Sequence, residues 1–260
     1  MPFTIAHPAA VLPFSRYLRA RQLLCAAVVG SMAPDFGIFL PVHLSRSETH
    51  SLLALVTFIL PAGLASYWIF QLVLKAPILA VLPDRAYQVA RPFSAPIDIG
   101  RVPSWILAAA GILLGALTHL AWDTFTHEGA RGMRMIPALD ELVLGARGHH
   151  VAGQRLLQDI SSLIGFAIIF WWVGWALRRG ASHATGPRVL GPQERALWLC
   201  LYGLIAVSVA IAAIFLMHDP ESGRLTLRAA ADDAAVASLR GLAASLLTVS
   251  LILNVRLPKR

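Results

Sequence analysis

Long apolar segments separated by short polar connections dominate the pattern of this chain of 260 residues. The clearest covers residues 102–129, opens at Pro103 and continues for about 24 residues, or about 36 Å of helix at 1.5 Å per residue. A helix of that length spans the hydrocarbon core of a bilayer. Further apolar segments of similar kind predict four more transmembrane helices: residues 51–74, 160–177, 195–217 and 239–254.

The N-terminal region has a different pattern. Residues 1–14 are apolar but reach only about 21 Å as a helix, and a basic turn at 15–21 follows them. Residues 22–40 are apolar again, with Pro34 and Asp35 interrupting them. The whole pattern predicts an all-α polytopic membrane helix bundle, in which a short N-terminal helical hairpin precedes about five transmembrane helices.

Composition supports a membrane protein. Hydrophobic residues make up 57% of the chain and charged residues 14%, against about 25% charged in a typical soluble domain. No long polar block is present that would form a separate soluble domain, so we expect one membrane domain over residues 1–260. Residues 1–180 carry the polar motifs, and residues 181–260 supply two further transmembrane helices.

The net charge of +8 is explained by cytoplasmic loops and anionic membrane lipids rather than by nucleic acid. We therefore expect membrane lipids as partners and no nucleic acid. Placing the basic turn at 15–21 in the cytoplasm also puts most Lys and Arg residues inside, with the C-terminus cytoplasmic.

Ionisable residues gather near the end of the 102–129 segment. His119, Asp123 and His127 are spaced i, i+4, i+8, which places them within about 80° of one another on one helix face. Two imidazoles and a carboxylate on one face can chelate a metal ion. The alternatives are an interfacial role for His127 and a hydrogen-bonded pair of His119 and Asp123 that joins helices.

Three more candidates lie in the first fifty residues. A hairpin that turns at 15–21 would bring His7 and Asp35 to similar depth, whereas an exposed His7 before Pro8 is the alternative. His50 begins the 51–74 segment, where it is either a ligand or an ordinary capping residue. Five candidates approach the extracytoplasmic side in the expected orientation, and His7 joins them if the hairpin forms: Asp35, His50, His119, Asp123 and His127.

Four motifs occur in order: MPFTIAHPAAVLPF, VVGSMAPDFGIFLP, THSLLAL and LLGALTHLAWDTFTH. Together they resemble the bacterial domain-of-unknown-function family 4184, over most of residues 1–180. More distantly they are similar to a family of predicted membrane-bound metal-dependent hydrolases. LLQDISS at 156–162 resembles a further motif, in which histidine often stands at the position of Asp159. The resemblance implies a multi-pass protein of the bacterial inner membrane with these metal ligands: His7, Asp35, His50, His119, Asp123 and His127.

The more distant resemblance implies a metal-dependent hydrolase. A metal-activated water would attack an ester or phosphoester, and the position near the membrane surface makes a lipid or lipid-linked phosphate the candidate substrate. Mixed histidine and carboxylate ligands suit a divalent ion, Zn²⁺ first, with Mn²⁺ or Fe²⁺ as alternatives. Six candidates exceed the three protein ligands of a catalytic zinc, so one or two ions are expected. Glu128 and Asp159 are candidate general bases, or else solvated loop residues.

Two other classes of function stay open. The same ionisable residues suit a transporter with a proton or metal-ion pathway. They also suit a structural metal in a non-enzymatic membrane scaffold. The G-x-S-x-G, Walker A and H-E-x-x-H motifs are missing, which argues against a nucleophile-elbow hydrolase, a P-loop NTPase and a zincin.

The expected orientation is testable with a reporter fused to the C-terminus. We expect a cytoplasmic reporter to be active there and an extracytoplasmic reporter to be silent, because most Lys and Arg residues then lie inside. The opposite pair of results would reverse the topology.

Overall fold

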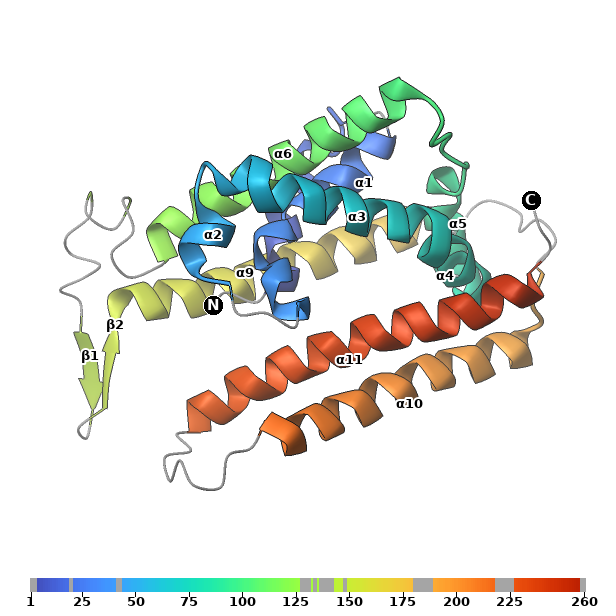
Figure 1. Ribbon diagram of the computed structural model, residues 1–260. Coiled ribbons are helices and arrows are strands. Elements are labelled where there is room, and N and C mark those ends of the chain that lie inside the picture. Colours follow the sequence, from blue (N-terminus) through green and yellow to red (C-terminus); the bar gives the residue numbers. More distant parts are fainter. Residues whose placement is uncertain are drawn as a thin grey trace. The chain divides into compact units, whose positions relative to one another are not determined.

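A computed structural model describes the chain at residues 4–18, 21–40, 44–126, 132, 135, 143–146, 149–179, 189–217 and 227–257. Its first elements are η1 (Thr4–Ala10), η2 (Leu12–Phe14), α1 (Arg21–Gly30), η3 (Ala33–Phe39) and α2 (Arg46–His50) (Figure 1). The next are η4 (Leu55–Ile59), α3 (Leu60–Ile69), η5 (Phe70–Leu74), α4 (Lys75–Val81), α5 (Asp84–Ala90) and η6 (Arg91–Phe93). The last are α6 (Val102–Thr126), β1 (Val143–Ala146), β2 (His149–Ala152), α9 (Gly153–Arg179), α10 (Pro192–Met217) and α11 (Leu227–Arg256).

Among the described residues, five helices are long and apolar enough to cross a membrane, which confirms the predicted all-α polytopic bundle. They cover Leu55–Val81, Val102–Thr126, Leu156–Arg179, Pro192–Ala212 and Ala234–Arg256. The first of them is not a regular α-helix throughout, because η4 and η5 are π-helical turns. The described residues add one feature that the pattern did not predict, the antiparallel hairpin of β1 and β2.

The N-terminal hairpin contains a bent helix pair. The segments Gln22–Gly30 and Ala33–Phe39 meet at 59°. The bend follows from Pro34, which has no backbone N–H to continue the α-helical ladder from α1. The second segment, η3, therefore starts in a new direction and carries Asp35 in its first turn.

The chain forms two compact units. Unit 1 comprises Met1–Tyr67 and Ile97–Arg179, and unit 2 comprises Trp68–Pro96 and Gly180–Arg260. Residues 68–96 thus group with the C-terminal helices, whereas residues 97–179 group with the N-terminal part of the chain.

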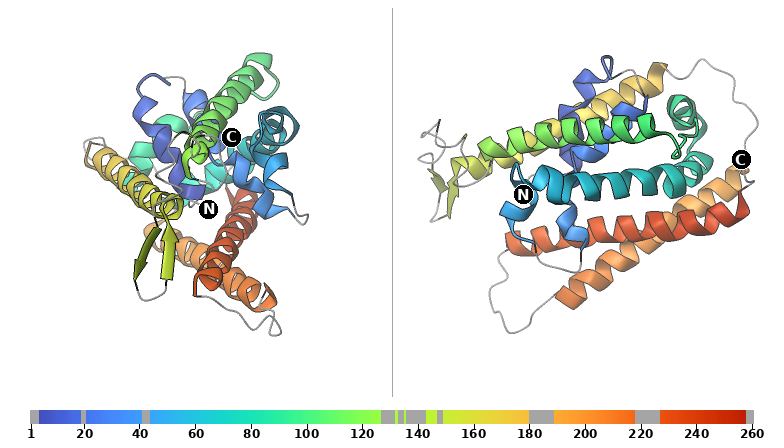
Figure 2. Two further views of the ribbon diagram at one scale, coloured as in Figure 1. Left: turned by 90° about the vertical axis from the view of Figure 1, so that its left-hand side faces the viewer. Right: turned by 45° about the horizontal axis from the view of Figure 1, so that its top comes forward.

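In unit 2, α10 and α11 lie side by side and are joined by polar contacts (Figures 1 and 2). The hydroxyl groups of Tyr202 and Ser250 are 3.0 Å apart, and Asn254 Nδ2 donates to the carbonyl of Val73 in η5 at 2.8 Å. Polar groups inside a membrane need such internal partners because lipid offers none.

In unit 1, glycines allow α6 to pack unusually close to α1. A Cβ added to Gly111 would lie 2.6 Å from the Cβ of Ala26, and one added to Gly115 would overlap the carbonyl oxygen of Ala27. Small residues at this spacing let two membrane helices approach backbone to backbone. The same i, i+4 stripe of α6 continues from Gly115 to His119, so this packing also fixes where His119 lies.

We expect Gly115→Ala to lower the melting temperature of the detergent-solubilised protein, although alanine favours a helix by about 1 kcal/mol over glycine. The reason is overlap with α1, since overpacking costs about 1–3 kcal/mol. Gly174→Ala on α9 is the matched control, because a Cβ there meets no atom within 4 Å. Equal melting temperatures for the two variants would show that the close approach does not limit stability.

Candidate metal centre

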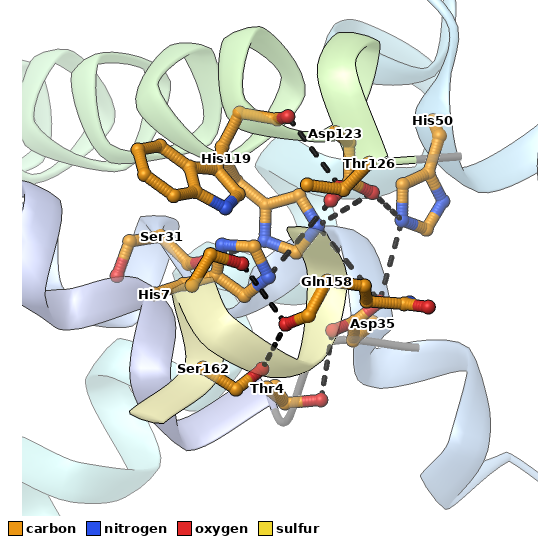
Figure 3. Close-up of polar contacts among 12 residues, drawn as sticks. Thr4, His7, Ser31, Asp35, His50, His119, Asp123, Thr126, Gln158 and Ser162 are labelled. Atoms are coloured by element: carbon orange, nitrogen blue, oxygen red, sulfur yellow. Dashed lines mark hydrogen bonds and ion pairs between the residues drawn. The ribbon is translucent and has the colours of Figure 1, made fainter. Parts of the chain in front are cut away.

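Four elements of unit 1 bring five of the predicted residues together (Figure 3). His7 lies on η1, Asp35 on η3, and His50 is the last residue of α2. His119 and Asp123 lie one turn apart near the end of α6. The fold explains this convergence. Pro34 bends η3 away from the direction of α1. The chain is extended at Ser51, between His50 and the membrane span that begins at Leu55.

Nitrogen and oxygen atoms of four side chains lie at the spacing expected around one metal ion. His50 Nε2 is 3.3 Å from Asp35 Oδ1 and 3.5 Å from Asp123 Oδ2. His119 Nε2 is 3.4 Å from Asp123 Oδ2 and 3.9 Å from Asp35 Oδ1. Metal–donor bonds of about 2.0–2.1 Å place tetrahedral donors about 3.3–3.4 Å apart. Three of the four distances match this spacing, and two sets of three residues could each hold an ion: His7, His119 and Asp123, and Asp35, His50 and His119.

His7 lies beside this set of four. Its ring stacks on the ring of His119 with centroids 3.7 Å apart, and its Nε2 is 4.0 Å from Asp123 Oδ1. The segment Thr4–Phe14 is too short to span a membrane. Burial, followed in size by the charge of nearby His119, lowers the pKa of His7 to about 4. His7 is therefore neutral near pH 7, which is the form that ligates metals.

The three histidines share an unusual feature. Among the described residues, the buried Nε2 atoms of His7, His50 and His119 have no hydrogen-bond partner, although each lies within 4.0 Å of a carboxylate oxygen. A buried polar atom without a hydrogen bond costs about 1–3 kcal/mol. Three such atoms that face two carboxylates form a donor set that fits a divalent cation.

The other ring nitrogens are already engaged. His119 Nδ1 is 2.8 Å from the carbonyl oxygen of Ser31, an acceptor only, so this nitrogen carries a proton, and in the neutral ring Nε2 would be the metal-binding atom. His50 Nδ1 is 2.7 Å from the hydroxyl of Thr49, which itself donates to the carbonyl of Ser45 at 3.4 Å. That arrangement also leaves Nε2 of His50 as the metal-binding atom.

The carboxylates have outer partners of their own. Thr4 Oγ1 donates to Asp35 Oδ2 at 2.7 Å, which leaves Asp35 Oδ1 facing the histidines. Arg46 Nη2 donates to Asp123 Oδ2 at 2.7 Å. The Arg46 side chain is 43% exposed while that of Asp123 is 4% exposed, so this arginine links the buried cluster to the surface.

Four residues that contact the cluster were not predicted from the sequence: Thr4, Ser31, Arg46 and Thr49. Spacing offered a signal for two of them, since Thr4 precedes His7 by three residues and Arg46 precedes His50 by four. One helical turn separates the members of each pair. Ser31 acts through its backbone carbonyl, which any residue type provides, so no sequence signal marks it.

The remaining candidates are not among the residues that form the described cluster. His127 and Glu128 lie outside the described residues. Asp159 is exposed on α9 and belongs to neither of the two donor groups, which are His7, His119 and Asp123, and Asp35, His50 and His119. The alternative of an exposed His7 is wrong, because His7 is buried. The alternative of a hydrogen-bonded His119–Asp123 pair is not what the structure has, because His119 Nε2 makes no hydrogen bond within the described part of the chain and the contact between segments is from His119 Nδ1 to Ser31.

Comparison with known proteins supports the resemblance of the motifs to family 4184. No curated protein and no solved structure matches the chain. One protein family matches it, over residues 1–251, which extends the likeness beyond the motif-bearing part into α11. The chain therefore belongs to the family described as a domain of unknown function, DUF4184.

Proposed function

We propose that this protein is a membrane-bound, metal-dependent hydrolase that cleaves an ester or phosphoester. The observation that carries the proposal is the convergence of three histidine Nε2 atoms on two carboxylates inside unit 1, each Nε2 without a hydrogen-bond partner among the described residues. Ionisable groups this deeply buried in a membrane protein are costly and usually serve a function.

Asp35, His50, His119 and Asp123 would hold the ion, with His7 as a fifth donor. A bound divalent ion supplies Lewis acidity, which activates water and polarises an ester carbonyl or phosphoryl oxygen. Since Nδ1 of His119 donates to Ser31, only one nitrogen of His119 remains for a metal. Both possible groups of metal ligands contain His119, and one nitrogen binds one ion, so a single bound ion is favoured over two. The mixed histidine and carboxylate donors would suit Mn²⁺ and Fe²⁺ as well as Zn²⁺.

The chain's own residues would create the conditions for hydrolysis. Burial of the cluster lowers the local dielectric and strengthens every charge interaction within it. Thr4 and Arg46 hold the two carboxylates in place, and Ser31 and Thr49 hold two of the imidazoles. In the reaction, water adds to the carbonyl carbon or phosphorus, the ester bond breaks, and the alcohol leaves with a proton.

The bacterial cytoplasmic membrane is the proposed location, with the cluster toward the extracytoplasmic side. The five apolar helices and the Lys and Arg distribution support this arrangement. A lipid or lipid-linked phosphoester would reach such a cluster without leaving the membrane.

A structural role for the metal, without catalysis, is the second candidate function. The contacts of Thr4 with Asp35 and of His119 with Ser31 tie η1, η3 and α6 to one another, so an ion here would also brace unit 1. In that case the purified protein would hold metal and show no turnover. A transporter would instead show ion flux without hydrolysis.

We expect the purified protein to retain about one divalent ion per chain, and His119→Ala and Asp123→Ala to lose most of it, because each removes a donor. Elemental analysis after dialysis against a weak chelator measures the content. Asp98→Asn is a suitable control, since Asp98 is an exposed residue of unit 1 paired with Arg101. Wild-type protein without Zn, Mn or Fe, even after reloading, would contradict the proposal.

Hydrolysis should be lost together with the metal. With chromogenic carboxylic and phosphoric esters as substrates, we expect the activity of His119→Ala and of Asp123→Ala to fall by at least about 100-fold. The double variant should be little worse than either single one, because residues that act as a unit are non-additive. Fully additive losses would indicate that the two residues do not hold one ion.

A further inference from the structure

A pocket of about 200 Å³ lies directly against the cluster, within unit 1. Its lining comes from η1, η2, α6 and α9, and His7 forms part of the wall. The wall is almost wholly apolar, with His7, Ser161 and Ser162 as its polar members. Figure 3 shows His7 and Ser162 in the neighbourhood of the carboxylates.

The serine hydroxyls of the wall do not call for a polar occupant. The hydroxyls of Ser161 and Ser162 both donate to the carbonyl of Gln158 at 2.9 Å, inside their own helix. Ala6 and Gly165 mark where η1 and α9 approach closely, since a Cβ on Gly165 would lie 3.0 Å from the Cβ of Ala6. Water in such a pocket would find few partners, so an apolar occupant is favoured.

The rim of the pocket lies on two membrane-spanning helices. Ile164 on α9 is 53% exposed and Trp122 on α6 is 44% exposed. Exposed apolar side chains of spanning helices face lipid tails rather than water. A hydrocarbon chain can therefore pass from the bilayer into the pocket without entering water.

Charge complementarity identifies the other end of the occupant. Asp123 Oδ1 faces His7, which forms part of the pocket wall, whereas Asp123 Oδ2 accepts from the half-exposed Arg46. With a metal on the carboxylate, the guanidinium is free to offer its other donors to an anion, and arginine binds phosphate in this way. The cluster thus lies between an apolar pocket and a cationic side chain.

We propose that the pocket between η1 and α9 binds one hydrocarbon chain of an anionic membrane lipid, whose phosphate headgroup Arg46 contacts. This names the substrate class of the same centre and rests on the proposed hydrolase function. It also assigns specificity: the chain in the pocket holds the scissile ester beside His7.

A photoreactive lipid tests the assignment. Full-length protein in mixed micelles is irradiated with phosphatidic acid that carries a diazirine in one acyl chain, and labelled peptides are mapped by mass spectrometry. We expect saturable labelling of residues 4–14 and 156–179. A diacylglycerol with the same diazirine chain should label the same peptides more weakly, because it has no phosphate for Arg46.

Two variants fill the pocket from opposite sides, Ala10→Leu on η1 and Ile168→Phe on α9. Each should reduce saturable labelling about tenfold, the effect of roughly one unfavourable contact of 1.4 kcal/mol. Matched controls are Ala167→Leu and Leu163→Phe, at exposed positions of α9 outside the lining, which should label like the wild type. Arg46→Gln should bring phosphatidic acid labelling down to the diacylglycerol level.

Labelling that spreads over all exposed helix faces and is unchanged by Ala10→Leu and Ile168→Phe would overturn the lipid pocket. Metal content is measured on every variant, which separates the two proposals. Metal-free wild type that still labels saturably would leave the lipid site standing and remove the hydrolase. Metal-loaded wild type without saturable labelling would leave the hydrolase standing and remove the lipid site.

Discussion

The close packing of α1 against α6 is the constraint on which unit 1 depends. Gly111 and Gly115 let the two backbones meet, and the same stripe of α6 then presents His119 to the carbonyl of Ser31 just beyond α1. A larger side chain at either glycine would separate the helices and break that contact. Asp35 would move as well, because it follows Ser31 by four residues on the bent segment. The positions of the cluster residues therefore depend on the packing of α1 against α6.

Burial explains why the cluster favours a cation. Two carboxylates in a low-dielectric interior repel each other, and Arg46 reaches only one of them, Asp123. The Nε2 atoms of the imidazoles next to them have no hydrogen-bond partner among the described residues. A divalent ion would neutralise both carboxylates and satisfy the imidazole nitrogens. One bound divalent ion would therefore remove the repulsion between the carboxylates and the lack of partners for the imidazole nitrogens together.

The proposed lipid pocket extends the same reasoning to the substrate. Its apolar wall meets the cluster at His7, and its rim lies on helices that face hydrocarbon. A water-soluble ester would have to leave water to pass that apolar rim, whereas a lipid is already in the surrounding hydrocarbon. The short η1 helix is important here, because one face carries His7 toward the cluster while Ala6, Ala9 and Ala10 leave space on the pocket side.

By itself, the sequence determined the five spanning helices, because about 20 apolar residues in a row have few other stable solutions. It also determined the pairing of His119 with Asp123, since residues four apart on a helix share a face. Tertiary structure alone decided that Asp35 and His50 face that pair, because the bend after α1 and the extended residue after α2 set their directions. It likewise decided the roles of Ser31 and Arg46, since contacts between distant segments leave no periodic trace in a sequence.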